Sequence, residues 1–202
     1  ATQDTAQRLN NPVFHIHGRD VPTSDMLVPF SMLLNLASVS SAETKEVMWG
    51  FINKYAPNAS PEKNPTLDAA AGFAVRYYHD FVKPLKVFRA PNSQERAALS
   101  DLATALKDVD VAKAMINKKN VDMGNGEDPV NTLNLGDADD LQSIVFAVGK
   151  NHGFEPLRSW FTAIYEILLG ASQGPRFGGF IALYGIDQTV ELVEVALNGD
   201  LT

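Results

Sequence analysis

Apolar residues recur along almost the whole chain at intervals of three and four positions, which is the spacing of an amphipathic helix with one buried face. Segments that alternate apolar and polar residues with a period of two, as half-buried strands do, are almost absent. The pattern therefore predicts an all-α fold. It predicts helices over residues 24–38, 40–55, 64–82, 92–106, 137–150, 160–169, 175–184 and 187–197.

Residues that start and stop helices stand at these boundaries. Short polar side chains that can accept hydrogen bonds from free backbone N–H groups precede the predicted helices at Ser24, Ser40, Asn64, Asn92 and Asp137. Ser40 and Asn92 are each followed three residues later by a glutamate, which is the capping-box spacing. Gly170 ends the helix that contains Trp160, and Gly185 ends the next.

Prolines divide the chain near its middle. Pro84 and Pro91 bound a segment, residues 83–91, that we do not expect to form regular helix, because proline disfavours helical backbone in the residue before it. We therefore predict an extended linker and two helical domains, residues 1–90 and 91–202. Residues 117–136 are rich in Asn, Gly, Asp and Lys and predict a mobile loop inside the second domain.

The net charge of −7 is unevenly distributed, since residues 1–90 carry +1 and residues 91–202 carry −8. This balance excludes a generic DNA-coating protein, and we expect no DNA partner. Any contact with nucleic acid in the second half has to involve a few local basic residues.

Other features of the composition narrow the class of protein further. The chain has no cysteine, which excludes disulfides, thiolate nucleophiles and cysteine-bound zinc. The longest uncharged run, residues 26–42, contains Pro29 and Asn35, so we expect no transmembrane segment. The polar start has neither an initiator methionine nor an apolar signal core, so we expect a fragment or a processed product, with a cytoplasmic location.

The sequence around Arg176 joins a glycine-flanked turn to a basic residue and aromatic rings. Pro175 is placed to start a helix, Arg176 follows at its positive end, and Phe177 and Phe180 continue an apolar face. A guanidinium beside free N–H groups and rings suits a phosphate or an unstacked base. Arg176 could equally cap the carboxyl end of a neighbouring helix.

A second candidate lies in the predicted linker. Lys83, Lys86 and Arg89 alternate with apolar residues in the segment that joins the two domains. Such a strip can follow a phosphate backbone, although three cations are also common on a solvated linker.

Motifs for catalysis, nucleotides and metals are missing from the sequence. No glycine-rich run matches a phosphate loop or a dinucleotide fingerprint, and no serine sits in a nucleophile elbow. His15 and His17 share one side of an extended segment, but no third metal ligand follows by spacing. We predict no catalytic residue, no metal site and no cofactor.

Long phrases in consistent order resemble the C-terminal half of class I lysyl-tRNA synthetases. They are residues 11–18, 45–52, 77–84 and 88–91 and, most specifically, 174–185, which read GPRFGGFIALYG. The resemblance implies a helical connecting domain that approaches the tRNA stem, followed by a helical bundle that receives the anticodon loop of lysine tRNA. It implies lysine tRNA and the catalytic domain of the parent enzyme as partners.

The chain also departs from that family. Nothing corresponds to the catalytic nucleotide-binding domain, its His-Ile-Gly-His signature or its Lys-Met-Ser-Lys-Ser loop, so ATP and lysine should bind a domain that is not in this chain. The leading hypothesis is a tRNA-binding, anticodon-binding fragment in which Arg176, Phe177 and Phe180 lie at the anticodon end. Lys83, Lys86 and Arg89 then position the stem or backbone. The alternative is a non-catalytic helical scaffold or protein-interaction module.

Overall fold

The computed structural model describes residues 12, 16, 25–40, 42, 44–122 and 133–201, except for the side chains of residues 118–122. Every regular element in these ranges is helical, which confirms the predicted all-α fold. The α-helices are α3 (Phe30–Val39), α4 (Lys45–Tyr55), α5 (Pro65–Tyr77), α6 (Ser93–Lys107), α7 (Val109–Asp122), α8 (Ala138–Asn151), α9 (Arg158–Ile164), α10 (Phe177–Tyr184) and α11 (Ile186–Asn198). Shorter turns adjoin them: the π-helical segments η1 (Tyr78–Val82) and η3 (Tyr165–Leu169), and the 3-10 segment η2 (Lys83–Leu85).

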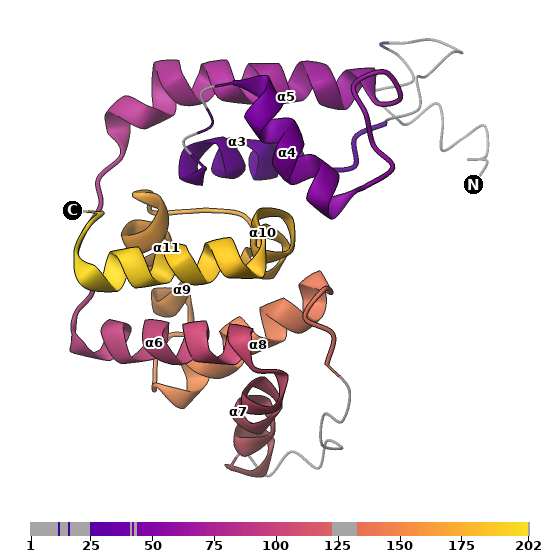
Figure 1. The fold of residues 1–202 in the computed structure, drawn as a ribbon. Coiled ribbons are helices and arrows are strands. Elements are labelled where there is room, and N and C mark those ends of the chain that lie inside the picture. The colour runs from indigo at the N-terminus through magenta and orange to yellow at the C-terminus, as the bar shows by residue number, and fades with distance from the viewer. Residues whose placement is uncertain are drawn as a thin grey trace.

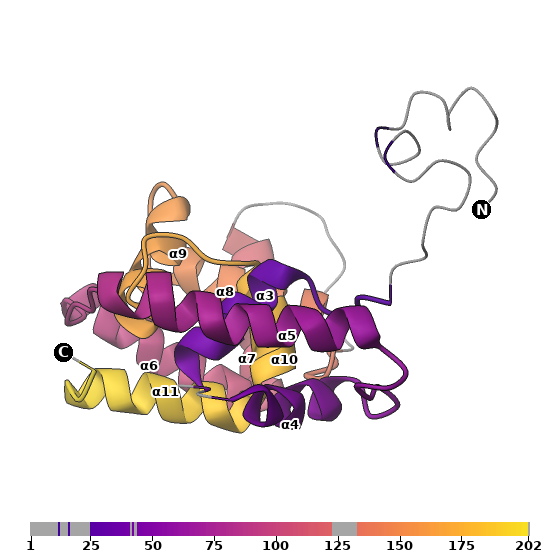
Figure 2. The same ribbon diagram turned by 90° about the horizontal axis from the view of Figure 1, so that it is seen from above.

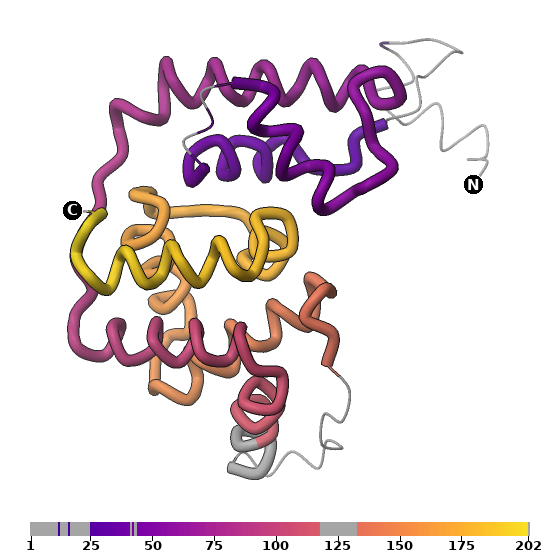
Figure 3. The backbone as a smooth tube through the Cα atoms, viewed as in Figure 1, coloured from indigo at the N-terminus to yellow at the C-terminus, as the bar shows by residue number. Residues whose placement is uncertain are grey.

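The helices form three levels in Figure 1, with α3, α4 and α5 at one end and α6, α7 and α8 at the other. Helices α9, α10 and α11 lie between them. From above, α4 and α11 lie along one side of the molecule and α9 along the other (Figure 2). The backbone trace in Figure 3 shows the segment from η2 to α6 running along one edge and joining the two ends. None of the helices described is long and apolar enough to cross a membrane.

One continuous apolar core connects the three levels. The predicted boundary at residue 90 falls between helices that share this core, because α10 packs on α3 and α4 as well as on α8. The two-domain division therefore remains a prediction. The largest fully buried side chains include Leu33, Leu36, Leu67, Leu99, Leu102, Leu141, Trp160, Phe177 and Phe180.

A glycine allows α8 and α10 to cross in direct backbone contact. A β-carbon on Gly178 would overlap the carbonyl oxygen of Ala138 and the backbone nitrogen of Gln142. The Gly178 N–H donates to Oε1 of Gln142 at 2.8 Å, and this amide is buried. The backbones of α8 and α10 therefore approach directly, which fixes where α10 begins.

Several predicted boundaries are confirmed. Asn92 and Glu95 form a complete capping box at α6, and Asp137 accepts hydrogen bonds from the first turn of α8. Gly170 follows η3 with φ 64°, a left-handed conformation that glycine adopts without a steric penalty. These signals are local, so the sequence alone was sufficient to predict them.

Other boundaries were wrong. The first helix begins at Phe30 rather than at residue 24, because Pro29 holds the preceding residue out of the helical region. Helix α4 is capped by Thr44 and not by Ser40, since the Thr44 hydroxyl accepts from the N–H of Val47 at 3.5 Å. Helix α10 begins at Phe177, two residues after Pro175.

The two predicted irregular segments are partly helical. Helix α7 continues to Asp122 through the first residues of the predicted 117–136 loop, whose residues 123–132 lie outside the described ranges. The predicted linker begins with the 3-10 turn η2, with Pro84 inside it, and becomes irregular from Lys86.

Candidate functional site

Residues 83–92, the crossing segment, carry the three cations that the sequence singled out, and the structure separates their roles. Arg89 is bound on two sides, donating from Nη1 and Nη2 to the two carboxylate oxygens of Glu95 at 2.7 and 2.8 Å and from Nε to Glu166 at 2.6 Å. These hydrogen bonds raise the pKa of Arg89, and the guanidinium lowers the pKa of Glu95, whose side chain is 7% exposed. Arg89 therefore ties the crossing segment to α6 and η3.

The Lys86 side chain also packs against the rest of the protein. Its Nζ donates to the carbonyl oxygen of Ser38 at 3.0 Å and lies 4.8 Å from the centroid of the Phe88 ring. Burial lowers the pKa of Lys86 to about 8, so the side chain is mostly charged at neutral pH. Lys83, by contrast, is exposed and forms no ion pair with any residue that the structure describes. It is the cation of this strip that is most accessible to a phosphate.

An exposed apolar stripe borders the crossing segment. Phe73, Tyr77 and Phe81 stand four residues apart along α5 and η1 and are 56%, 46% and 59% exposed. Leu85 and Val87 extend the stripe and are more exposed still. A cleft of about 620 Å³ lies against it and is closed on the other side by Glu166 and by the start of the loop after Gly170.

The turn at Arg176, residues 173–177, is called the elbow below and lies apart from the crossing segment. Arg176 is the N-cap residue of α10, and its exposed guanidinium donates from Nη1 to Oδ1 of Asp139 at 2.6 Å. Asp139 lies in the first turn of α8, so Arg176 pairs with the amino end of a neighbouring helix and not with its carboxyl end.

The two rings beside Arg176 are in the core. Phe177 and Phe180 are fully buried and stack with their centroids 5.4 Å apart. Neither ring presents a face on which a base could stack, because the i, i+3 spacing that placed them on one face points that face inward. The structure thus leaves Arg176 as the accessible residue of this predicted group.

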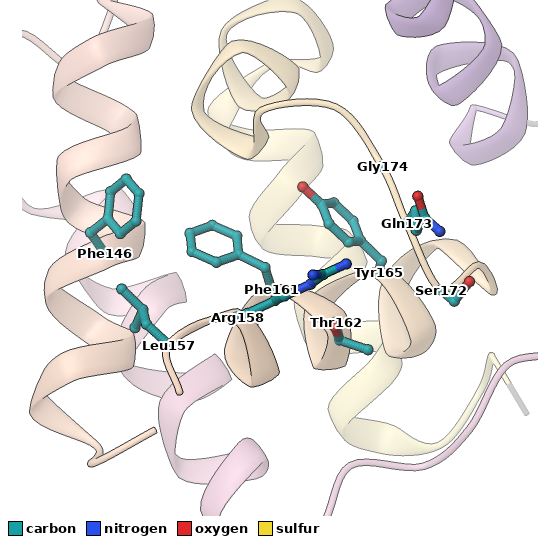
Figure 4. Close-up of a pocket in the computed structure, with 9 residues that line it drawn as sticks. All are labelled: Phe146, Leu157, Arg158, Phe161, Thr162, Tyr165, Ser172, Gln173 and Gly174. Atoms are coloured by element: carbon teal, nitrogen blue, oxygen red, sulfur yellow. The ribbon is translucent and has the colours of Figure 1, made fainter. Parts of the chain in front are cut away.

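A groove beside the elbow was not foreseen. It has a volume of about 460 Å³ and lies between α8, the α9–η3 helix and residues 172–174 (Figure 4). Its floor is one face of α9–η3, since Arg158, Phe161 and Tyr165 are spaced by three and four residues. Phe146 of α8 meets Phe161 edge-on, with ring centroids 5.1 Å apart. Ser172 borders both this groove and the cleft at the crossing segment.

Arg158 is the residue that sequence reasoning missed. It is exposed, and no hydrogen bond or ion pair joins its side chain to another described residue. Figure 4 shows it extending along the floor of the groove toward Tyr165. The i, i+3 and i, i+7 spacing to Phe161 and Tyr165 was readable in the sequence, but the absence of a carboxylate partner depends on the tertiary structure.

Metal coordination finds no support in the residues that the structure describes, where no three His, Asp or Glu side chains are grouped to hold an ion. Nε2 of His152 lies 2.8 Å from Oδ2 of Asp101 in a simple pair. His15 and His17, considered above as ligands, lie outside the described residues.

Comparison with known proteins shows that the whole chain is similar to part of a longer enzyme. It is 61% identical over 203 residues to the lysine–tRNA ligase of Roseobacter denitrificans, a match that covers 100% of this chain and 34% of that protein. It is 38% identical over 193 residues to the lysine–tRNA ligase of Rickettsia conorii and 39% identical over 196 residues to that of Rickettsia bellii, and each match covers at least 95% of this chain and 33% of the relative. The chain therefore spans about a third of the length of the curated relatives that it matches. No protein-family model and no solved structure matches it.

Proposed function

We propose that this chain is the tRNA-binding C-terminal region of a class I lysine–tRNA ligase, which binds lysine tRNA, at its anticodon end, for aminoacylation by a separate catalytic domain. The observation that carries the proposal is the 61% identity to a lysine–tRNA ligase over the full length of this chain. The all-α fold supports it, because a nucleotide-binding sheet has no counterpart in the described residues. ATP and lysine then bind the catalytic domain, and the chain acts in the cytoplasm.

Accessible cations supply the contacts in this proposal. Lys83 and Arg176 are exposed and can each reach a phosphate, whereas Lys86 and Arg89 hold the crossing segment in place and add positive potential behind it. A few contacts of this kind position an RNA without reading its sequence.

The test is a salt titration of binding to lysine tRNA and to a non-cognate tRNA. Each phosphate contact contributes roughly 0.7 to 0.9 to the slope of log affinity against log salt. Lys83→Ala and Arg176→Ala should each lower the magnitude of this slope by roughly 0.7 to 0.9, which is the contribution of one phosphate contact. Lys54→Ala, which removes an exposed charge on α4, should leave the slope unchanged. Absence of binding to either tRNA at low salt would refute the proposal.

The exposed stripe at Phe73, Tyr77 and Phe81 favours a second function, a helical scaffold that binds another protein domain. Exposed apolar patches commonly mark protein interfaces, and the charge of −8 in residues 91–202 disfavours a broad RNA surface. The same titration separates the two, because a scaffold binds neither tRNA.

A further inference from the structure

The groove floored by α9–η3 combines an apolar surface with polar groups that the fold does not use. Phe161 is half-buried and keeps part of its ring on the groove, and Phe146 beside it is 39% exposed. Pockets for small planar ligands are mainly apolar, with a few polar groups that fix orientation, and have volumes of about 300 to 1,000 Å³. At about 460 Å³ the groove has the size and lining of such a site.

The loop that forms the other wall is held in place. The Tyr165 hydroxyl donates to the carbonyl oxygen of Pro175, and burial raises the pKa of this phenol, so it stays protonated as the donor. A β-carbon on Gly174 would lie 2.5 Å from Cε1 of Tyr165, which shows that the backbone rests directly on the ring. The groove is therefore formed before any ligand arrives, and Gln173 stands exposed at its rim.

The positive charge of the groove comes from Arg158, and the other arginines in the described residues each contact a partner. Arg76 lies over the Phe73 ring, Arg89 binds Glu95 and Glu166, Arg96 donates to a backbone carbonyl and Arg176 pairs with Asp139. Arg158 has no such contact, although it lies in the half of the chain that carries −8. An exposed arginine without a partner, beside an aromatic ring, is suited to an anionic and planar ligand.

We propose that this groove receives one unstacked base of a bound RNA, an inference that rests on the proposed tRNA-binding function. Phe161 supports the face of the base, Arg158 binds the phosphate next to it, and the Gln173 amide hydrogen-bonds an edge of the base. Aromatic and guanidinium groups hold splayed-out RNA bases in this way, and a fully paired helix cannot present one.

Variants of the ring and of the arginine test this assignment in the chain. Binding of labelled lysine tRNA at low salt should weaken about tenfold in Phe161→Leu, because the base loses the aromatic ring on which it stacks. Phe161→Tyr keeps the ring and should bind as the unmodified chain does. Arg158→Gln should weaken binding, and Lys54→Gln, on a helix that contributes nothing to the groove, should not.

A duplex RNA of the same length is the second probe, because all its bases are stacked. Its binding should be equal for the unmodified chain and Phe161→Leu, with thermal melting showing that both are folded. If the chain binds lysine tRNA but Phe161→Leu binds it equally well, the base site is wrong and the tRNA-binding proposal stands. An equal loss in Phe161→Leu and Phe161→Tyr would also overturn the base site. If the unmodified chain binds no tRNA, both proposals fail.

Discussion

The crossing segment and the α9–η3 groove each place an arginine among aromatic and aliphatic side chains, yet the two arginines have different roles. Arg89 is surrounded by carboxylates, with Glu95 bound through two nitrogens and Glu166 through a third. Arg158 has no carboxylate partner among the described residues and lies along an open groove. A basic-aromatic pattern in a sequence is thus compatible with either a structural or a binding role. The charged partners brought by distant segments decide which one applies.

Removal of Arg89 should have the largest effect. Arg89→Ala should lower the free energy of unfolding by about 2 to 4 kcal/mol, because Glu95 is left buried without its cation. Chemical denaturation measures this change. Lys83→Ala on the same segment is the matched control and should change stability by less than about 0.5 kcal/mol. Equal effects of the two variants would contradict the structural role of Arg89.

A substitution at Gly174 tests how closely residues 172–174, which form one wall of the groove, pack against Tyr165. Gly174→Ala should destabilise by about 1 to 3 kcal/mol, because the added methyl overlaps the Tyr165 ring. Gly50→Ala on α4 is the opposite case, since nothing lies within 4 Å of the new β-carbon. It should stabilise by up to about 1 kcal/mol. A neutral Gly174→Ala would show that residues 172–174 do not rest on Tyr165.

Lys86 provides a pH signature of the crossing segment. Its pKa is about 8 in the fold and 10.5 in an unperturbed lysine, so between these values the unfolded chain binds more protons. Stability should therefore rise with pH in this window, by at most about 1.4 kcal/mol per pH unit. The measurement compares denaturation of the unmodified chain and of Lys86→Met from pH 7 to 10. If the difference in free energy of unfolding between the two proteins does not change with pH, the Lys86 ammonium group is solvated and not buried.

Arg158 should show the smallest effect on stability. Arg158→Gln should leave the free energy of unfolding within about 0.5 kcal/mol, because the side chain has no partner in the described fold to lose. Thermal melting beside Arg89→Ala gives the direct comparison. A large loss of stability would mean that Arg158 acts in the fold as Arg89 does.

Local signals explain what the sequence predicted correctly. The Asn92–Glu95 capping box and the left-handed Gly170 are decided within a few residues. The apolar face that contains Phe177 and Phe180 was also recognised, but the same spacing was assigned to the binding of a base. The two rings are buried because α8 approaches α10 at Gly178, and that contact joins segments far apart in the sequence.

The sequence did not reveal which charged side chains form ion pairs with each other. Arg89 and Arg158 look alike as basic residues near rings, and only the tertiary structure brings Glu166 to the first. Arg176 was correctly placed at the start of a helix, but its partner Asp139 belongs to α8 and could not be identified from the sequence around Arg176. Whether Arg176 and the strip at Lys83 contact RNA remains a prediction.

The π-helical turn η3 has a consequence for how this region tolerates changes in length. A π-turn holds about one residue more than an α-helical turn. Deleting one residue after Tyr165 and before Gly170 would replace the π-turn by an α-helical turn and leave Gly170 and the loop to Pro175 in nearly the same direction, because the π-turn holds the extra residue within one turn. The same deletion in α9, which is regular α-helix, would rotate the chain that follows by about 100° and turn Gly170 and the loop to Pro175 away from Phe161. The groove therefore tolerates the loss of one residue in the π-turn and not in the regular helix before it.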